Sequence, residues 1–186
     1  MSKIFVCSDL HLSHDRQFVW GARGFNSIEE MNATIIERFN SVVSPEDEVY
    51  ILGDLCLGGA DSLEANRAML EQLNGKLHII LGNHDTPARI AMYRELPSVV
   101  EVVYATMLRY RGYHFYLSHF PTMTGNLDDD KPLKARVINI CGHNHTTDKF
   151  IDMNKGLIYH VELDAHGCYP ILLDTVIEDI KHFGQN

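Results

Sequence analysis

The sequence predicts an α/β fold in which two mixed β-sheets pack face to face and helices cover them outside, a four-layer α-β-β-α sandwich with its functional site at the strand ends. Apolar stretches of strand length alternate with amphipathic helices in the first half, and the second half is rich in strand-like stretches. The chain has 186 residues, enough for one domain with a real core and short for two. We therefore expect a single domain over residues 1–186.

In the first half, a helix is predicted after each of three strands. The strands cover residues 4–7, 49–52 and 77–81. The first helix has the strongest signal, because Ser27 and Glu30 form a capping box in which the serine accepts from the third helical amide and the glutamate reaches back. Apolar residues then recur at steps of three and four as far as Val42, which predicts one buried stripe.

The second and third helices are predicted from their end signals. The second begins after Asp61 or Ser62 and runs to Gly75, a glycine expected to end it in the left-handed conformation. The third starts with Pro87 in its first turn and stops at Leu96, before the next proline.

The second half is predicted to be mainly strands. They cover residues 99–104, 107–110, 113–117, 137–141, 157–163 and 171–173. Arg111 and Gly112 are expected to form a tight turn. The stretch 122–136 is expected to be a mobile loop, with its acidic triplet as a solvated tip and not a cation site.

Charge and composition exclude several classes of partner. The formal net charge of -9 opposes binding to long nucleic acid, which requires a basic surface, but permits a small phosphate ester. No apolar stretch approaches the ~20 residues that span a bilayer, so no membrane partner is expected. The four cysteines are scattered without a CxxC pair, which favours reduced thiols and a cytoplasmic location.

Five of the predicted strands end within a residue or two of side chains that bind divalent metals. These side chains are Asp9, His11, Asp54, Asn83, His84, Asp85, His119, His143 and His145. If the strands share a sheet, their ends meet at one edge, where open α/β sheets place their sites. A dinuclear metal centre would account for the metal-binding side chains at all five strand ends, and such a centre indicates a hydrolase.

The order of these motifs resembles the calcineurin-like metallophosphoesterase superfamily. The matching motifs are Asp9-x-His11, Gly53-Asp54, Gly82-Asn83-His84-Asp85, His119 and Gly142-His143-x-His145. Each motif alone is common, but the ordered set is specific and extends from Lys3 to about Asp174. The segment from Asp9 to Met31 further resembles a small, single-domain bacterial and phage branch of the superfamily. The resemblance implies a double β-sandwich flanked by helices.

The resemblance also implies a ligand set for each of two divalent metal ions. The first ion would be held by Asp9, His11 and His145. Asp54 would bridge the two ions, and the second site would be completed by Asn83, His119 and His143. Members of the family use manganese, iron, zinc, nickel or similar ions, and mixed oxygen and nitrogen donors do not select one of them.

The expected chemistry is hydrolysis of a phosphoester. Two cations about 3.5–4 Å apart share a solvent molecule and lower its pKa to roughly 7, so that the bridging hydroxide becomes the nucleophile. The cations also bind the phosphoryl oxygens and align an in-line displacement. His84 would be the catalytic acid that protonates the departing oxygen, with Asp85 orienting it.

Two further residues are candidates for substrate binding. His14 follows the first motif closely and is expected to line the pocket, and Arg23 is expected to grip a substrate phosphate with two hydrogen bonds. Ordinary surface or loop positions are the alternative for both.

The leading interpretation is a dimetal phosphodiesterase that acts on small or nucleotide-type diesters. The alternatives are a phosphomonoesterase or phosphatase, and a metal-binding scaffold of the same fold without turnover. Scaffolds of this kind lose the catalytic histidine or a ligand, whereas His84 and all seven ligand positions are present here. The sequence predicts neither the native metal nor the oligomeric state.

Overall fold

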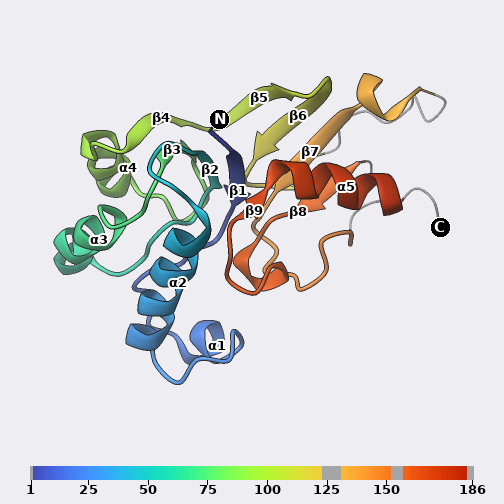
Figure 1. Cartoon of the computed structure of the whole chain (residues 1–186). Coiled ribbons are helices and arrows are strands. Elements are labelled where there is room, and N and C mark those ends of the chain that lie inside the picture. Colours follow the sequence, from blue (N-terminus) through green and yellow to red (C-terminus); the bar gives the residue numbers. More distant parts are fainter. Residues whose placement is uncertain (1, 123–130, 152–156, 184–186) are drawn as a thin grey trace.

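A computed structural model describes residues 2–122, 131–151 and 157–183, and there the chain forms two mixed β-sheets flanked by helices (Figure 1). The predicted fold class is therefore confirmed. The single domain expected over residues 1–186 stays a prediction, since parts of that range lie outside the described residues.

The first sheet has five strands in the order β4-β3-β2-β1-β9. They are β1 (Ile4–Cys7), β2 (Glu48–Leu52), β3 (Lys76–Ile80), β4 (Val99–Val103) and β9 (Ile171–Leu172). β1 to β4 are parallel, and the short β9 pairs with β1 in the antiparallel direction. Cys7 lies opposite Ile51, which lies opposite Ile79, so the carboxyl ends of β1, β2 and β3 are level.

The second sheet has four strands in the order β5-β6-β7-β8. They are β5 (Ala105–Tyr110), β6 (Tyr113–Ser118), β7 (Val137–Cys141) and β8 (Ile158–His160). β5 and β6 form an antiparallel hairpin, and β6, β7 and β8 are parallel. Arg111 and Gly112 both have positive φ values, of 51° and 83°. A two-residue turn with that backbone matches the twist of a hairpin, as the sequence predicts.

The helices are α1 (Gln17–Trp20), α2 (Ile28–Val42), α3 (Leu63–Leu70), α4 (Pro87–Glu95) and α5 (Leu173–Phe183). Figure 1 shows α2, α3 and α4 beside the first sheet and α5 near β8 and β9. Buried apolar residues of α2, α3 and α4 form one core with alternate residues of β1, β2 and β3, among them Phe5, Ile51 and Ile79. This packing follows the period of two along each strand.

A second core lies between the sheets. Val6, Leu52 and Ile80 of the first sheet pack in one cluster with Phe115 and Ile140 of the second. The buried side of α5 joins the same cluster through Leu173, Val176, Ile177 and Ile180. The two sheets and α5 are thus held together by continuous apolar contact, which sets the carboxyl ends of β1, β2 and β3 beside those of β6 and β7.

Two helix ends differ in detail from the sequence prediction. Ser27 caps α2 by accepting from the backbone N–H of Glu30, but the Glu30 carboxylate accepts from the backbone and side-chain amides of Asn26 instead of Ser27. α3 ends at Leu70 and not at Gly75. Gly75 has a φ of 96°, and a Cβ there would lie 2.9 Å from Cγ2 of Val49, so this glycine serves close packing before β3.

Other differences concern short segments. The chain adds α1 and the 3-10 turns Ala60–Ser62, Leu133–Ala135 and Leu163–Ala165, which the sequence patterns did not predict. The strand expected at 157–163 covers only Ile158–His160, because a 3-10 turn follows it. Of the expected loop 122–136, residues 123–130 with the acidic triplet lie outside the described residues.

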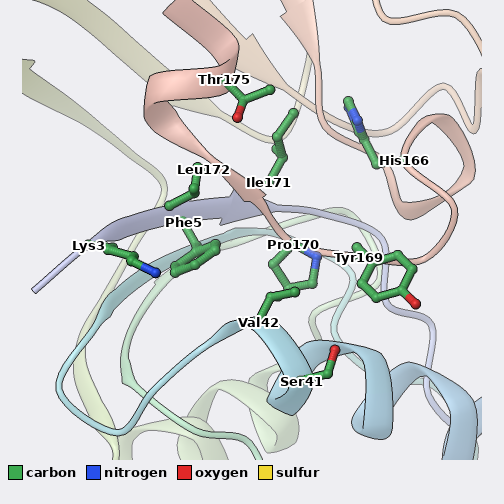
Figure 2. A pocket seen from close by; sticks show the side chains of 10 residues that line it. All are labelled: Lys3, Phe5, Ser41, Val42, His166, Tyr169, Pro170, Ile171, Leu172 and Thr175. Carbon is green, nitrogen blue, oxygen red and sulfur yellow. The ribbon is translucent and has the colours of Figure 1, made fainter.

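A cavity of about 550 Å³ lies at the edge strand β9, between it and the end of α2 (Figure 2). Phe5, Val42, Tyr169 and Leu172 are among its lining residues, and none of the candidate ligands lines it. Among the described residues, no helix combines the length and apolar character that crossing a membrane requires.

Candidate metal centre

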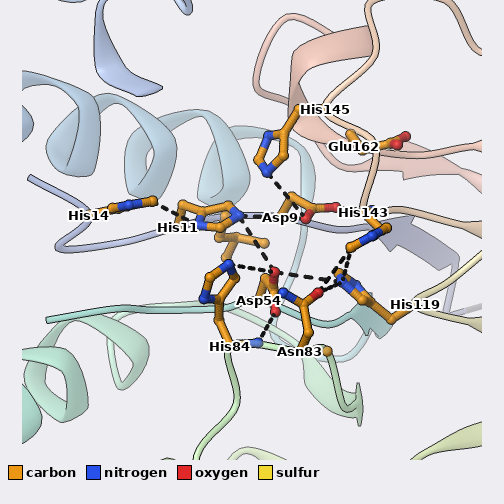
Figure 3. A network of polar contacts seen from close by, with 12 residues as sticks. Asp9, His11, His14, Asp54, Asn83, His84, His119, His143, His145 and Glu162 are labelled. Atoms are coloured by element: carbon orange, nitrogen blue, oxygen red, sulfur yellow. Dashed lines mark hydrogen bonds and ion pairs between the residues drawn. The ribbon is translucent and has the colours of Figure 1, made fainter. Parts of the chain in front are cut away.

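The strand ends bring the seven predicted ligands around one centre (Figure 3). Asp9 follows β1, Asp54 follows β2, Asn83 follows β3, His119 follows β6, and His143 and His145 follow β7. Two groups of three, Asp9 with His11 and His145, and Asp9 with Asp54 and His119, each place their potential donor atoms within 4.8 Å of one another. Residues far apart in the chain thus offer ligands at one place.

The first half of the centre, hereafter the Asp9 half, consists of Asp9, His11 and His145. Oδ1 of Asp9 lies 3.5 Å from Nε2 of His11 and 3.7 Å from Nε2 of His145. These separations are longer than hydrogen bonds. Asp9 and His11 are almost fully buried, while His145 is partly exposed. Three donor atoms therefore face one point without bonding to one another.

The second half, hereafter the Asn83 half, consists of Asn83, His119 and His143. Oδ1 of Asn83 lies 2.9 Å from both Nε2 of His119 and Nδ1 of His143, and the two ring nitrogens are 3.2 Å apart. The other nitrogen of His119 donates to the carbonyl oxygen of Leu52 at 2.8 Å. That bond directs Nε2 of His119 to the centre.

Asp54 lies between the two halves. Its Oδ2 is 3.7 Å from Nε2 of His11, 3.5 Å from Nε2 of His119 and 3.9 Å from Nε2 of His84. Its Oδ1 accepts from the backbone N–H of His84 at 2.9 Å. One oxygen thus fixes the carboxylate and the other faces histidines from both halves.

Glycines precede three of these residues because the strand ends approach closely. A Cβ on Gly53 would overlap the ring of His119, and one on Gly82 would overlap the carboxylate of Asp54. A Cβ on Gly142 would overlap Oδ2 of Asp9. The glycines of the motifs are therefore needed for the packing of the centre itself.

The backbone of the centre is strained. Asp9, His11, Asp54, His143 and His145 all have positive φ values, between 49° and 79°. Non-glycine residues rarely adopt this region, and each instance costs of the order of 1–3 kcal/mol. Five such residues at one site indicate that side-chain placement there outweighs local backbone preference.

Two buried polar atoms of the Asp9 half lack a hydrogen-bond partner among the described residues. They are Oδ1 of Asp9 and Nε2 of His11. Such a group costs about 1–3 kcal/mol when it is left without a partner. Both atoms are of the kinds that bind divalent cations, and they point toward Oδ2 of Asp54 and Nε2 of His145. The donor set therefore fits a metal ion.

The comparison with protein families agrees with this geometry. A family model described as calcineurin-like phosphoesterase matches residues 2–184. The chain belongs to the calcineurin-like phosphoesterase family. It is therefore a metal-dependent phosphoesterase, and its Asp and His groups are suited to bind metal.

Relatives of this phosphoesterase occur in archaea and phages. It is 34% identical over 184 residues to an uncharacterized protein of Methanocaldococcus jannaschii, covering 97% of this chain and 93% of that protein. It is 30% identical over 203 residues to the Gene 66 protein of Mycobacterium phage L5, covering 98% and 96%. A solved protein of unknown function from Aquifex aeolicus shares the fold, with a TM-score of 0.73, 18% identity and coverage of 96% and 99%.

The charges around the centre follow from burial and from neighbouring imidazoles. Burial favours the protonated form of Asp9, but its interaction with His11 and the nearby histidines outweighs this and lowers the pKa of its carboxyl. Burial lowers the pKa of His11 and of His143. Ionised carboxylate and neutral imidazole are the forms that bind metal ions.

His145 differs because it has a carboxylate partner. Its Nδ1 lies 3.2 Å from Oδ2 of Asp164, and this hydrogen bond raises the pKa of the imidazole. The bond also leaves Nε2 of His145 facing Asp9. A carboxylate on the far nitrogen commonly orients a metal-binding histidine and increases its basicity.

In this phosphoesterase His84 is at the rim of the centre with its side chain 44% exposed, so it is accessible to a substrate. Its backbone carbonyl accepts from Arg89, and its backbone N–H donates to Oδ1 of Asp54, so the backbone is held in place. Asp85 does not orient the His84 ring, contrary to the sequence expectation. Its carboxylate accepts from the N–H groups of Asp54 and Gly82 and from the hydroxyl of Tyr93.

The two candidate substrate-binding residues have different surroundings. His14 lines a cavity next to the centre, and its Nδ1 lies 3.1 Å from Nδ1 of His11. The guanidinium of Arg23 instead donates to the carboxylate of Asp164 and to the carbonyl oxygens of Asp9 and Leu10. The expected binding of a substrate phosphate by Arg23 stays a prediction. In the structure these hydrogen bonds hold Asp164 and the backbone at residues 9 and 10 in place.

Two carboxylates that support the centre were missed by the sequence reasoning. Asp164 binds both His145 and Arg23. Glu162 is fully buried, and its Oε1 accepts from the backbone N–H of Asn144, between His143 and His145. Glu162 and Asp164 stand at alternate positions directly after an apolar stretch that ends at Val161. The other site residues also follow strand ends, so this pattern could have identified the two carboxylates from the sequence.

Proposed function

We propose that this chain is a dinuclear metal-dependent phosphodiesterase for small diesters. In this proposal the Asp9 half holds one divalent cation, the Asn83 half holds the second, and Asp54 bridges them. The position of Oδ2 of Asp54, 3.7 Å from His11 and 3.5 Å from His119, supports the bridging role. Manganese, iron, zinc and nickel all suit the mixed oxygen and nitrogen donors.

The observation that carries the proposal is a pair of buried atoms, Oδ1 of Asp9 and Nε2 of His11, for which the described part of the chain offers no hydrogen-bond partner. Natural proteins provide a hydrogen-bond partner for almost every buried polar atom. Two such atoms without a partner in that part of the chain, at the place where five strand ends meet, therefore require an explanation. The strained backbone of the same residues adds to the cost. A bound cation accounts for both, since it satisfies the donor atoms that the strain brings together.

The residues of the chain have separate tasks in the proposed reaction. When bound, a pair of divalent cations supplies an activated water and neutralises charge on the phosphoryl oxygens. His84 gives a proton from its ring to the departing oxygen, because it is exposed at the rim and directly follows Asn83. The hydrogen bond that His145 donates to Asp164 orients the His145 ring, and Arg23 fixes the backbone carbonyl of Asp9.

Two features favour small substrates and a reducing location. The net charge of -9 repels long nucleic acid but has less influence on a small ester next to bound cations. The four cysteines are buried, and burial raises the pKa of Cys7, Cys56 and Cys168. Inert thiols of this kind suit the cytoplasm, which we infer as the location.

The test uses protein stripped of metal and reloaded with manganese, zinc, nickel or iron(II). We expect two ions per chain and hydrolysis of bis-p-nitrophenyl phosphate that is absent from the stripped protein. Faster hydrolysis of p-nitrophenyl phosphate would favour a phosphomonoesterase instead. Two bound ions without activity on either ester would favour a binding scaffold, and failure to bind two ions would contradict the dinuclear centre.

A further inference from the structure

A cavity of about 550 Å³ adjoins the metal centre on the side of His84. Its polar wall includes His11, His84 and His145, and its apolar wall consists of Phe18, Val19 and Ala22. The volume is within the range of about 300–1,000 Å³ that holds small ligands in proteins. The cavity therefore has room for one substituent of an ester whose phosphorus lies at the centre.

The position of His84 decides which substituent the cavity holds. A proton donor must lie within hydrogen-bond reach of the oxygen that it protonates. In the proposed function that oxygen belongs to the leaving group, and His84 lines this cavity. The leaving group therefore extends along the wall formed by Phe18, Val19 and Ala22.

The apolar wall comes from α1 and the residues that follow it. Val19 is buried in the core and anchors the helix, whereas the side chain of Phe18 is 73% exposed. The Phe18 ring packs edge-on to the ring of His14, with centroids 5.9 Å apart and an angle of 84° between the planes. An exposed aromatic ring held in this way offers its surface to a flat apolar group.

The side chains around the cavity favour an uncharged leaving group over an anionic one. Of the described residues that line it, none is a lysine or an arginine, and Asp164 contributes a carboxylate. The nearby Arg23 is already bonded to Asp164 and to two backbone carbonyls. A second phosphate or a carboxylate on the leaving group would therefore find no lysine or arginine side chain in this lining to pair with.

We propose that this cavity is the leaving-group subsite and that it binds an uncharged, flat aromatic ring against Phe18. The substrate class is then a phosphoester of an alcohol or phenol that carries such a ring, and the proposal rests on the proposed function. In the reaction the bond from phosphorus to the leaving oxygen breaks, and its electron pair stays with that oxygen. Water supplies the oxygen that joins phosphorus, and the proton that His84 gives up is replaced from water.

The first test measures binding without turnover. Isothermal titration calorimetry of the manganese-loaded protein compares phenylphosphonate, methylphosphonate and 4-carboxyphenylphosphonate. We expect phenylphosphonate to bind roughly tenfold more tightly than the other two, the scale of one aromatic stacking contact. Phe18→Ala should abolish this preference, and Phe18→Tyr should retain it. Tyr104→Ala, which removes an aromatic side chain that is 78% exposed elsewhere, is the matched control and should change nothing.

The second test identifies which group leaves. Phenyl methyl phosphate and adenosine 5′-methyl phosphate are hydrolysed, and the products distinguish release of the ring-bearing group from release of methanol. Phenolate is the better leaving group whatever the subsite binds, so the second ester, whose two leaving oxygens are both alkoxides, is decisive. Release of adenosine from it would support the subsite, and release of methanol from it would contradict the proposal.

The failure of this proposal is distinguishable from that of the proposed function. If Phe18→Ala hydrolyses bis-p-nitrophenyl phosphate and keeps the wild-type preference for phenylphosphonate, the subsite is wrong while the phosphodiesterase stands. If the wild-type protein hydrolyses no ester in any metal form, both are wrong. Circular dichroism of each variant shows whether it is folded, and Phe18→Leu serves as a second variant if Phe18→Ala is not.

Discussion

The Asp9 half and the Asn83 half of the metal centre differ in what their donor atoms contact. In the Asp9 half the facing atoms are 3.5 and 3.7 Å apart and leave two buried atoms without partners. In the Asn83 half the corresponding separations are shorter, 2.9 to 3.2 Å. Because Nδ1 of His119 donates to Leu52, Nε2 of His119 and Oδ1 of Asn83 face each other as two acceptors, so neither half satisfies all of its polar atoms by itself.

The two halves also differ in the contacts that hold their side chains in place. The Asp9 half is held open from outside by Asp164, which binds His145, and by Arg23, which binds the carbonyl of Asp9. The Asn83 half has the bond from His119 to the carbonyl of Leu52 and a bond from the backbone N–H of His143 to Oδ2 of Asp9. We infer that the Asp9 half is preorganised for a cation and binds it more tightly, because less rearrangement is needed there.

The largest effect is expected from Asp54→Asn, which changes the residue shared by both halves. Loss of the bridging charge should lower kcat by more than about a hundredfold, the scale on which one electrostatic stabiliser acts. Metal analysis should also show fewer than two ions per chain. An active variant with two tightly bound ions would contradict the bridging role.

A smaller effect, confined to catalysis, is expected from His84→Gln. General acid catalysis contributes about 10²–10⁴-fold, so hydrolysis of esters with poor leaving groups should fall on that scale. Esters of p-nitrophenol should be affected less, since p-nitrophenolate leaves without a proton. Metal content should stay normal. His182→Gln, an exposed histidine on α5, is the control, and equal turnover in both variants would remove the acid role.

Asp164→Asn tests the support of the Asp9 half. The amide cannot keep both the charged pair with Arg23 and the orientation of His145, so metal affinity should fall by about 10- to 100-fold. The affinity expected to fall is that for the more tightly bound ion, the one assigned to the Asp9 half. Asp61→Asn, which changes an exposed carboxylate away from the centre, should leave both affinities unchanged. A loss confined to the weaker ion would reverse the assignment of the halves.

The smallest effect is expected from Asn83→Ala, which removes one neutral ligand of the weaker half. Titration with a chelator, followed by metal analysis, should show one ion released more readily than in the wild type. The ion of the Asp9 half should be retained, and at a hundredfold excess over its Kd it adds about 2.7 kcal/mol to stability, measured as a higher Tm. Equal loss of both ions would show that the halves are not independent.

The sequence predicted the strand ends well because each ends in a sharp change from apolar to polar residues. Gly53, Gly82 and Gly142 precede site residues, and the structure explains them through the close approach of neighbouring strands. The helix over 28–42 was also predictable, because capping and periodicity agree locally. These signals depend on a few adjacent residues, so they can be recognised without knowledge of the tertiary structure.

The contacts that the supports of the centre make were not predictable in this way. Arg23 and Asp164 are separated by 141 residues, and nothing in either local sequence indicates that they pair. Asp85 follows His84 directly, yet its carboxylate turns to Gly82 and Tyr93. α3 ends at Leu70, before Gly75, and Gly75 packs closely against Val49, a contact that local propensity does not contain.

By itself, the sequence determined which side chains end the strands and therefore the chemistry of the site, because alternation and turn residues act over short distances. Only the tertiary structure decided how those side chains face one another. The register of parallel strands and the packing between the sheets set the 3.5 Å and 2.9 Å separations that make the halves unequal. Such distances arise from contacts between remote segments, which no local pattern encodes.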